Sequence, residues 1–199
     1  LLLGMCFVLG ACTSQTSTVQ TTEKGTQWEW QNGTIVVKTP ERPAGQKSVL
    51  GLTTPKLEAV RVGFVGLGMR GPGAVERFTY IPGTQVVALC DYEEARADKC
   101  QELLKKASMP KAAVYSGDKG YEELCKRDDI DLVYIAADWL HHFPVAKCAL
   151  ENGKNVAIEV PSAMNLQECW DLINLSESTR KHCFILENCC YDWFEMNTL

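Results

Sequence analysis

Apolar residues recur in short runs along the second two thirds of the chain, and each run is followed by a longer amphipathic segment. The runs cover residues 61–65, 85–90, 113–115, 131–136, 155–159 and 183–187. Runs of this length that are rich in Val and Ile predict buried strands, and the segments between them have the period of helices. Six strands that alternate with helices predict an α/β fold: a doubly wound parallel sheet with helices on both faces.

Two helix boundaries can also be predicted. Asn165 is followed three residues later by Glu168, which indicates a capping box at the start of one helix. Pro144 is expected at the start of the preceding helix, because the first turn does not need the N–H that proline lacks. Gly153 follows the end of that helix.

Residues 13–60 lack this alternation and predict a linker and an N-terminal arm. Within them, Asn32-Gly33 separates two β-prone runs, which predicts a hairpin with a type I′ turn. Residues 39–55 are rich in Pro and Gly, and we expect them to lie as an arm over the main domain.

Residues 1–12, LLLGMCFVLGAC, are apolar and end in small residues. This stretch is too short to span a bilayer and resembles the apolar region of a signal peptide. Its last four residues resemble a bacterial lipobox, whose Cys becomes lipidated. The stretch therefore predicts an exported bacterial lipoprotein, periplasmic or at the cell surface, held to a membrane through lipidated Cys12. The alternative interpretation is a frayed hydrophobic N-terminus.

Composition narrows the classes of function. The chain has 199 residues, of which 46% are hydrophobic, so it can bury one sizeable core. A net charge of −5 without a basic patch argues against a nucleic-acid partner. The ten cysteines show no CxxC pair, so we expect neither a disulfide framework nor a metal site, and we expect most of them to be buried.

The turn after the first strand has the pattern that a dinucleotide requires. Gly66-x-Gly68-x-x-Gly71 follows RVGFV, and Asp91 stands 20 residues after Gly71, at the end of the second strand. The first Gly permits a tight turn, the second lets the backbone approach the pyrophosphate, and the third allows close helix packing. The carboxylate is expected to accept a hydrogen bond from a ribose 2′-OH, which favours NAD over NADP. Residues 61–188 are therefore interpreted as a Rossmann domain that binds NAD.

The other candidates follow the later strands, because ligands lie at the carboxyl ends of the strands in such a sheet. Arg70, in the glycine turn, lies either along the pyrophosphate or in solvent. Residues 136–144, AADWLHHFP, carry a Trp and two His that either form a wall for the nicotinamide half or cap the next helix. Glu159 follows the fifth strand, where a carboxylate is expected to serve a site. After the sixth strand, Asn188 offers an amide and Tyr191 a hydroxyl for acid–base work.

Taken in order, these segments resemble the Gfo/Idh/MocA superfamily, which includes glucose–fructose oxidoreductase and inositol 2-dehydrogenase. Its pattern is a Gly-rich turn, an Asp after strand two, TPNxxH after strand four and EKP after strand five. Here His142 takes the position of the family His, and Ala137-Asp138 replaces Thr-Pro. The larger departure is Val160, which stands where the dehydrogenases carry their catalytic Lys.

That departure indicates one branch. EVPSA after strand five, MRG in the glycine turn, Trp139 with the following His and Pro, and ENCCY after strand six together resemble glycoside hydrolase family 109 over residues 60–199. The members of that family resemble α-N-acetylgalactosaminidases with a tightly held NAD. Beyond Gly66 and Gly68, the resemblance implies cofactor contacts at Met69, Arg70, Asp91, Trp139, Leu140, His141, His142, Glu159, Val160 and Asn188.

The resemblance also implies a reaction on a glycan or glycoside with α-linked N-acetylgalactosamine. Hydride leaves C3 of the sugar for NAD, a base removes the C2 proton, the C1 substituent is eliminated, water adds, and the hydride returns. Tyr191 is the candidate acid–base group. We expect the chain to be a fragment, in which residues 189–199 begin a second, α+β substrate domain that is otherwise missing. A homo-oligomer is compatible with this assignment.

Two alternatives belong to other classes. The first is an NAD-dependent sugar or polyol dehydrogenase, against which Val160 argues. The second is a lipoprotein that binds a sugar or the cofactor without catalysis.

Overall fold

The computed structural model describes residues 20–21, 27–38 and 41–198, which fall into two units, residues 1–40 and 41–199. The predicted signal peptide and the lipidated Cys12 lie outside the described residues. Within the part of the chain that is described, no helix combines the length and the apolar character that a membrane span needs.

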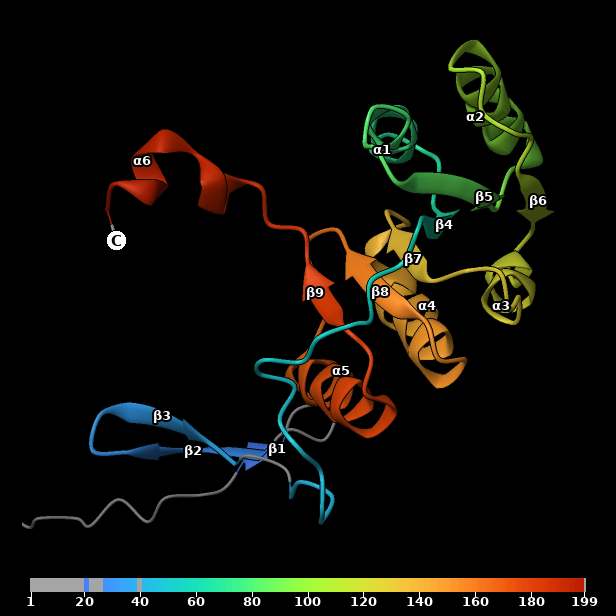
Figure 1. The fold of residues 1–199 in the computed structure, drawn as a ribbon. Coiled ribbons are helices and arrows are strands. Elements are labelled where there is room, and N and C mark those ends of the chain that lie inside the picture. Colours follow the sequence, from blue (N-terminus) through green and yellow to red (C-terminus); the bar gives the residue numbers. More distant parts are fainter. Residues whose placement is uncertain (1–19, 22–26, 39–40, 199) are drawn as a thin grey trace, which may run out of the picture. The chain divides into compact units, whose positions relative to one another are not determined.

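The first unit contains a small antiparallel sheet (Figure 1). Its strands are β1 (Gln20–Thr21), β2 (Gln27–Gln31) and β3 (Thr34–Val37), in that order. Asn32 and Gly33 join β2 to β3 with φ values of 50° and 80°. Positive φ at both central residues is the conformation of a type I′ turn, so the predicted hairpin is confirmed.

The second unit is built on a parallel sheet, as predicted. The sheet order is β6-β5-β4-β7-β8-β9, so the chain moves outward from β4 in one direction and then returns to build outward in the other. All six predicted strands are confirmed, with ends that differ by no more than two residues. They are β4 (Val60–Val65), β5 (Thr84–Asp91), β6 (Ala113–Ser116), β7 (Leu132–Ile135), β8 (Asn155–Ile158) and β9 (Cys183–Ile185).

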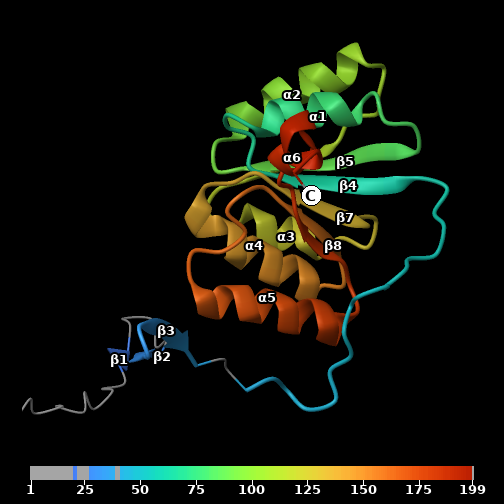
Figure 2. The ribbon, with the colours of Figure 1, turned by 90° about the vertical axis from the view of Figure 1, so that its left-hand side faces the viewer.

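Helices cover both faces of this sheet. Figure 2 shows α1 and α2 on one face and α3, α4 and α5 on the other. A 3-10 turn η1 and a short helix α6 follow β9. The helices are α1 (Gly71–Phe78), α2 (Glu94–Lys106), α3 (Gly120–Cys125), α4 (Trp139–Glu151), α5 (Leu166–Thr179), η1 (Cys189–Tyr191) and α6 (Trp193–Met196).

Side-chain caps mark the starts of α4 and α5. At α5, Asn165 Oδ1 accepts a hydrogen bond from Glu168 N at 3.0 Å, which confirms the predicted cap. At α4 the prediction was wrong, because Pro144 lies inside the helix and not at its start. The Asp138 carboxylate accepts from Leu140 N at 3.0 Å and starts α4 five residues before the proline expected to start it.

The core has one apolar layer on each face of the sheet. Phe64 and Val62 are fully buried on the side of α1 and α2, and Ile135 and Ile158 are fully buried on the other side. The eight cysteines of the described residues are all free. The expectation that most cysteines are buried was only partly right, because Cys169, Cys189 and Cys190 are exposed; each lies on a helix or turn surface that nothing in the described chain covers.

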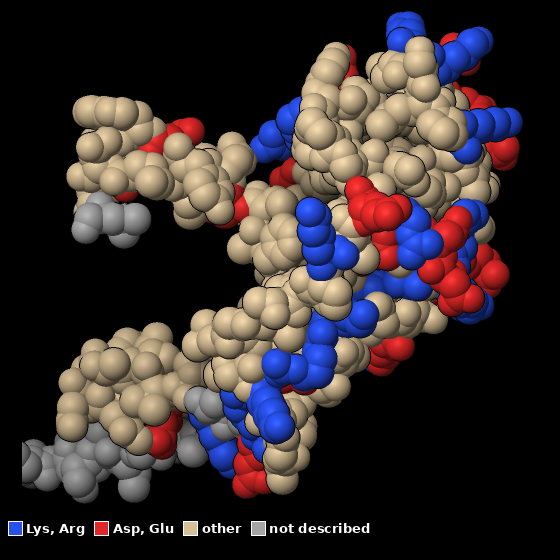
Figure 3. All heavy atoms as spheres, in the orientation of Figure 1, with Lys and Arg blue, Asp and Glu red and all other residues tan. Residues whose placement is uncertain are grey.

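Residues 41–48 contact α5 and the residue that ends it. Gln46 Nε2 donates to Asn174 O at 3.0 Å, and Arg180 Nη1 donates to Lys47 O at 2.7 Å. Arg42 pairs with the buried carboxylate of Glu177. On the face of the molecule drawn in Figure 3, basic and acidic side chains are interspersed rather than segregated.

An ion pair joins the starts of the two central strands. Arg61 donates through Nε and Nη2 to both carboxylate oxygens of Asp131, at 2.9 and 2.7 Å, and its backbone N donates to Oδ2 at 2.9 Å. The hydrogen bond from Arg61 lowers the pKa of Asp131 below its usual value, against an opposing effect of burial. The ionised carboxylate therefore stabilises the folded chain above the pKa that it has when unfolded, and this contribution is lost as the pH falls through the lower folded pKa.

We predict that Asp131→Asn lowers the melting temperature at pH 7 by roughly 2–4 °C, because it removes one charge of a bidentate pair. The difference from the wild type should disappear at pH values below the folded pKa of Asp131. Asp128→Asn, at an exposed position three residues earlier, is the matched control and should change the melting temperature by less than about 1 °C. Equal melting temperatures of Asp131→Asn and the wild type at pH 7 would contradict the prediction.

Candidate cofactor site

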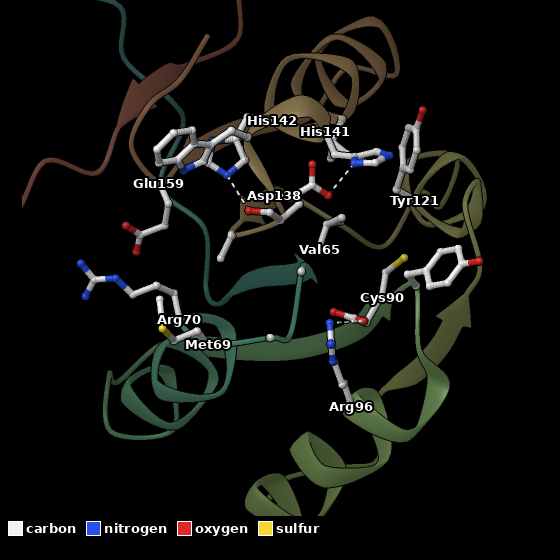
Figure 4. Close-up of a pocket in the computed structure, with 18 of the residues that line it drawn as sticks. Val65, Met69, Arg70, Cys90, Arg96, Tyr121, Asp138, His141, His142 and Glu159 are labelled. Atoms are coloured by element: carbon white, nitrogen blue, oxygen red, sulfur yellow. Dashed lines mark hydrogen bonds and ion pairs between the residues drawn. The ribbon is translucent and has the colours of Figure 1, made fainter. Parts of the chain in front are cut away.

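A cavity of about 650 Å³ opens at the carboxyl edge of the parallel sheet (Figure 4). It is lined from every strand end between β4 and β8, so it follows the crevice where the order of the strands reverses. Its lining residues are Val65, Gly66, Gly68, Met69, Arg70, Cys90, Asp91, Tyr92, Arg96, Gly117, Asp118, Tyr121, Ala136, Ala137, Asp138, Trp139, His141, His142, Val145, Glu159 and Val160.

The three glycines of the turn serve different purposes. Gly66 has φ +90°, and a Cβ there would lie 2.3 Å from Ala137 N. A Cβ on Gly71 would lie 2.2 Å from Gly66 O. The start of α1 at this position therefore requires glycine at residue 71. At Gly68 a Cβ would meet only Arg96 Nη1, at 3.6 Å, so the turn is open there to the cavity. This opening is where a pyrophosphate approaches the backbone, and the turn therefore fits a dinucleotide.

Asp91 lines the cavity and also holds neighbouring segments of the site together through hydrogen bonds. Its Oδ2 accepts from Leu67 N at 2.6 Å, and its Oδ1 accepts from Glu93 N at 2.9 Å and from Arg96 Nη1 at 3.3 Å. A carboxylate offers about four acceptor positions, so Oδ2 retains one for a ribose hydroxyl. The same side chain thus ties the glycine turn to the start of α2 and faces the cofactor.

His142 supports the opposite wall of the cavity. It is buried, and its Nδ1 lies 2.7 Å from Pro161 O while its Nε2 lies 3.0 Å from Ala137 O. The ring therefore joins the loop after β7 to the loop after β8. Its neighbour His141 contacts the Asp138 carboxylate through Nδ1 at 2.6 Å. Burial is the largest single effect on the pKa of Asp138 and raises it, but the hydrogen bond with His141, the charge of His141 and the backbone hydrogen bonds together lower that pKa below its usual value.

Glu159 accepts a hydrogen bond from a buried tyrosine of the neighbouring strand. Tyr134 OH donates to Glu159 Oε1 at 2.7 Å, and both residues are buried. Tyr134 packs against Phe64 and Phe78, with ring centroids 5.1 and 5.7 Å away. Burial, together with the hydrogen bond to Glu159, raises the pKa of Tyr134 to about 12, so the hydroxyl remains a donor near neutral pH.

Cys90 is the cysteine in the lining, and its thiol is not a nucleophile at neutral pH. Burial, with the charge of Asp91 as a second cause, raises its pKa to about 12. Because the thiolate is the reactive form, Cys90 acts here as a small apolar wall.

Most residues predicted for the site are brought together, and three are not. Leu140 and Tyr191 are highly exposed, at 73% and 81%, and Asn188 is exposed after β9; none of the three lines the cavity. Their proposed contacts and the acid–base role of Tyr191 stay predictions. The residues that do line it are Gly66, Gly68, Met69, Arg70, Asp91, Trp139, His141, His142, Glu159 and Val160.

The sequence reasoning overlooked several lining residues near the adenosine end. Gly117 and Asp118 follow β6 directly, so the rule that ligands lie after strands would have found them. Tyr121 and Arg96 are on helices, and Tyr134, which contacts Glu159 without lining the cavity itself, lies within a strand. No local motif marks these three, because only the packing of the sheet brings them to the site.

Comparison with known proteins agrees with this geometry. The profile of the oxidoreductase family with an NAD-binding Rossmann fold, Gfo/Idh/MocA, matches residues 60–186. The chain belongs to this family. The predicted Rossmann domain and the predicted cofactor, NAD, are thereby confirmed, and the open turn at Gly68 is the part of the site that fits the cofactor.

Proteins with closely similar sequences carry the name glycosyl hydrolase family 109 protein, which confirms the resemblance seen in the motifs. The chain is 82% identical over 199 residues to protein 4 of that name from Phocaeicola vulgatus, covering 100% of this chain and 39% of the relative. It is 58% identical over 200 residues to protein 1 of that name from Bacteroides thetaiotaomicron, covering 100% of this chain and 42% of the relative. The chain thus spans about two fifths of the length of these relatives.

Solved structures show the same fold. Myo-inositol dehydrogenase from Lactobacillus casei, solved with NAD(H) and myo-inositol, superposes with a TM-score of 0.60 at 23% identity, covering 70% of this chain and 42% of that one. An oxidoreductase from Klebsiella pneumoniae, described as putative, gives a TM-score of 0.58 at 23% identity, covering 68% and 37%. At this identity the likeness concerns the fold alone.

We predict that Gly68→Ala folds like the wild type but binds NAD at least about tenfold more weakly, since the methyl group occupies the approach of the pyrophosphate. Isothermal calorimetry on the full-length protein gives the affinity, and a melting curve reports the fold. Gly73→Ala is the control, because its Cβ makes only an ordinary contact, 3.5 Å from Arg77 Nη1 within α1. Unchanged affinity in Gly68→Ala would contradict the role assigned to this glycine.

Proposed function

We propose that the full-length protein is a glycosidase that uses a resident NAD to cleave α-linked N-acetylgalactosamine. The observation that carries the proposal is Val160, which lines the cavity directly after β8, where the dehydrogenases of the family have a catalytic Lys. Among the described residues that line the cavity there is no lysine. The closely similar relatives carry the name glycosyl hydrolase family 109 protein, which supports the hydrolysis of a glycoside.

The presence of Val instead of Lys at position 160 removes a group that could transfer protons at the carboxyl edge of the sheet. A lysine there would exchange a proton with the hydroxyl being oxidised, which is what a simple alcohol dehydrogenase needs. An isopropyl group cannot move a proton, and it places an apolar surface in the cavity beside Glu159. The wall is then suited to holding the cofactor and the sugar ring, while acid–base work falls to other groups, of which Tyr191 is our candidate.

NAD supplies the chemistry that a pair of carboxylates supplies in other glycosidases, by accepting a hydride from C3 of the sugar and returning it. The role of the described residues is to bind and orient. The glycine turn and Asp91 would hold the pyrophosphate and the adenosine ribose, and His142 keeps the loops after β7 and β8 together. Oxidation at C3 acidifies the C2 proton of the sugar, which permits elimination of the C1 substituent.

The test is to incubate the full-length protein with an aryl α-N-acetylgalactosaminide in deuterated water. We expect released sugar that carries deuterium at C2, because the C2 proton exchanges with solvent during the reaction, and we expect no net formation of NADH. Protein stripped of NAD should regain turnover when NAD is added back. Sugar release without deuterium at C2 and without need of NAD contradicts the proposal, whereas steady NADH accumulation with a free sugar supports a dehydrogenase instead.

A further inference from the structure

Glu159 and Tyr134 form a buried polar pair for which the proposed reaction has no direct use. Glu159 is 8% exposed and Tyr134 is 5% exposed, yet the carboxylate faces the cavity. Figure 4 shows Glu159 at one end of the site, and Cys90 and Arg96 at the other. A buried carboxylate at the end of a strand is costly to keep, so its presence calls for a function.

The position of Glu159 decides which half of the cofactor it faces. Asp91 and Arg96 mark the adenosine end, and the open turn at Gly68 marks the pyrophosphate. The cavity then continues past Trp139 to Glu159 and Val160. The nicotinamide half is the part of the dinucleotide left for that end.

Two hydrogen bonds hold Glu159 in place, one from its backbone and one to its carboxylate, and packing holds the donor of the second. Glu159 N donates to Ile135 O at 2.9 Å, which continues the ladder between β7 and β8. Tyr134 OH donates to Oε1 at 2.7 Å from the next strand. Tyr134 in turn is packed against Phe64 and Phe78, so the donor has little freedom to move. A preorganised charge in a partly dry site acts more strongly than one on a mobile surface chain.

Charge distinguishes the two oxidation states of the cofactor at this end. The nicotinamide ring is a cation in NAD⁺ and is neutral in NADH, while the pyrophosphate has the same charge in both. A carboxylate near the ring therefore stabilises only the oxidised form. Two nearby cations have the opposite effect: Arg70 lines the same cavity from the exposed glycine turn, and Arg77 interacts with the Tyr134 hydroxyl from α1. The Glu159 carboxylate is therefore the group at this end whose charge favours the oxidised ring.

We propose that Glu159, positioned by Tyr134, makes this site prefer NAD⁺ over NADH. The inference rests on the proposed function and deepens it, because a glycosidase with a resident cofactor must begin every cycle in the oxidised state. Val160 beside it adds no opposing charge, in contrast to the lysine of the dehydrogenases. Glu159 and Tyr134 thus favour the oxidised form of the cofactor between turnovers.

The test compares affinities for the two cofactors in the full-length protein stripped of dinucleotide. Direct binding of fluorescent NADH, and its displacement by NAD⁺, give the ratio of the NADH Kd to the NAD⁺ Kd. We expect Glu159→Gln to lower this ratio about tenfold, which corresponds to about 1.4 kcal/mol. Tyr134→Phe, which keeps the ring but removes the donor, should lower it about threefold.

Two controls separate charge from structure. Asp118→Asn removes a carboxylate from the adenosine end of the same cavity and should leave the ratio within about twofold of the wild type. Tyr115→Phe repeats the loss of a hydroxyl at a residue of β6 whose partner is Arg127, and it too should leave the ratio unchanged.

A ratio that stays at the wild-type value in Glu159→Gln, with both cofactors still bound, would overturn the inference. So would an equal loss of affinity for NAD⁺ and NADH, which would show that Glu159 serves binding alone. Glycosidase turnover does not enter this measurement. A protein that fails to cleave the aryl glycoside but shows the shift in ratio would overturn the proposed function and support the inference about Glu159.

Discussion

The site depends on one constraint, the close approach of the backbone at Gly66 to the backbone of the residues that follow β7. A single added carbon at residue 66 would lie within 2.5 Å of the backbone of Ala136 and Ala137. Because β4 and β7 are neighbours at the point where the strand order reverses, their two connections diverge, and the space between them becomes the crevice. Gly71 must then pass equally close to Gly66 O for α1 to start at the cavity. Each later part of the site is placed relative to this crossing.

Much of this architecture could be predicted from the sequence, because local rules and the global fold agree. The six apolar runs became six parallel strands, and Asn32-Gly33 formed the expected turn. The part of the cavity around Gly66, Gly68 and Asp91 was also predictable, because each residue of this short motif has a known physical role in binding a dinucleotide. Pro144 shows the limit of such rules, since the cap at Asp138 started the helix before the proline.

The remaining parts depend on tertiary packing, which no local pattern encodes. In the sequence Tyr134 resembles one more apolar position of a strand, and only the folded chain brings its hydroxyl to Glu159. His142 lines the cavity as expected, but the sequence did not show that its ring nitrogens lie against two backbone carbonyls and so join two loops. The chemically distinctive feature of the site is accordingly a pair of adjacent residues: Val160 provides no proton transfer, and Glu159 provides a charge at the nicotinamide end.

The proposed function requires that NAD stays bound in this protein as a catalyst and is not exchanged at each turnover. The most direct measurement is to purify the full-length protein without added dinucleotide, denature it, and quantify the released cofactor by chromatography and mass spectrometry. We expect about one dinucleotide per chain, present as NAD and mainly in the oxidised form. Protein that contains no dinucleotide, or that contains NADP or mainly NADH, would contradict it.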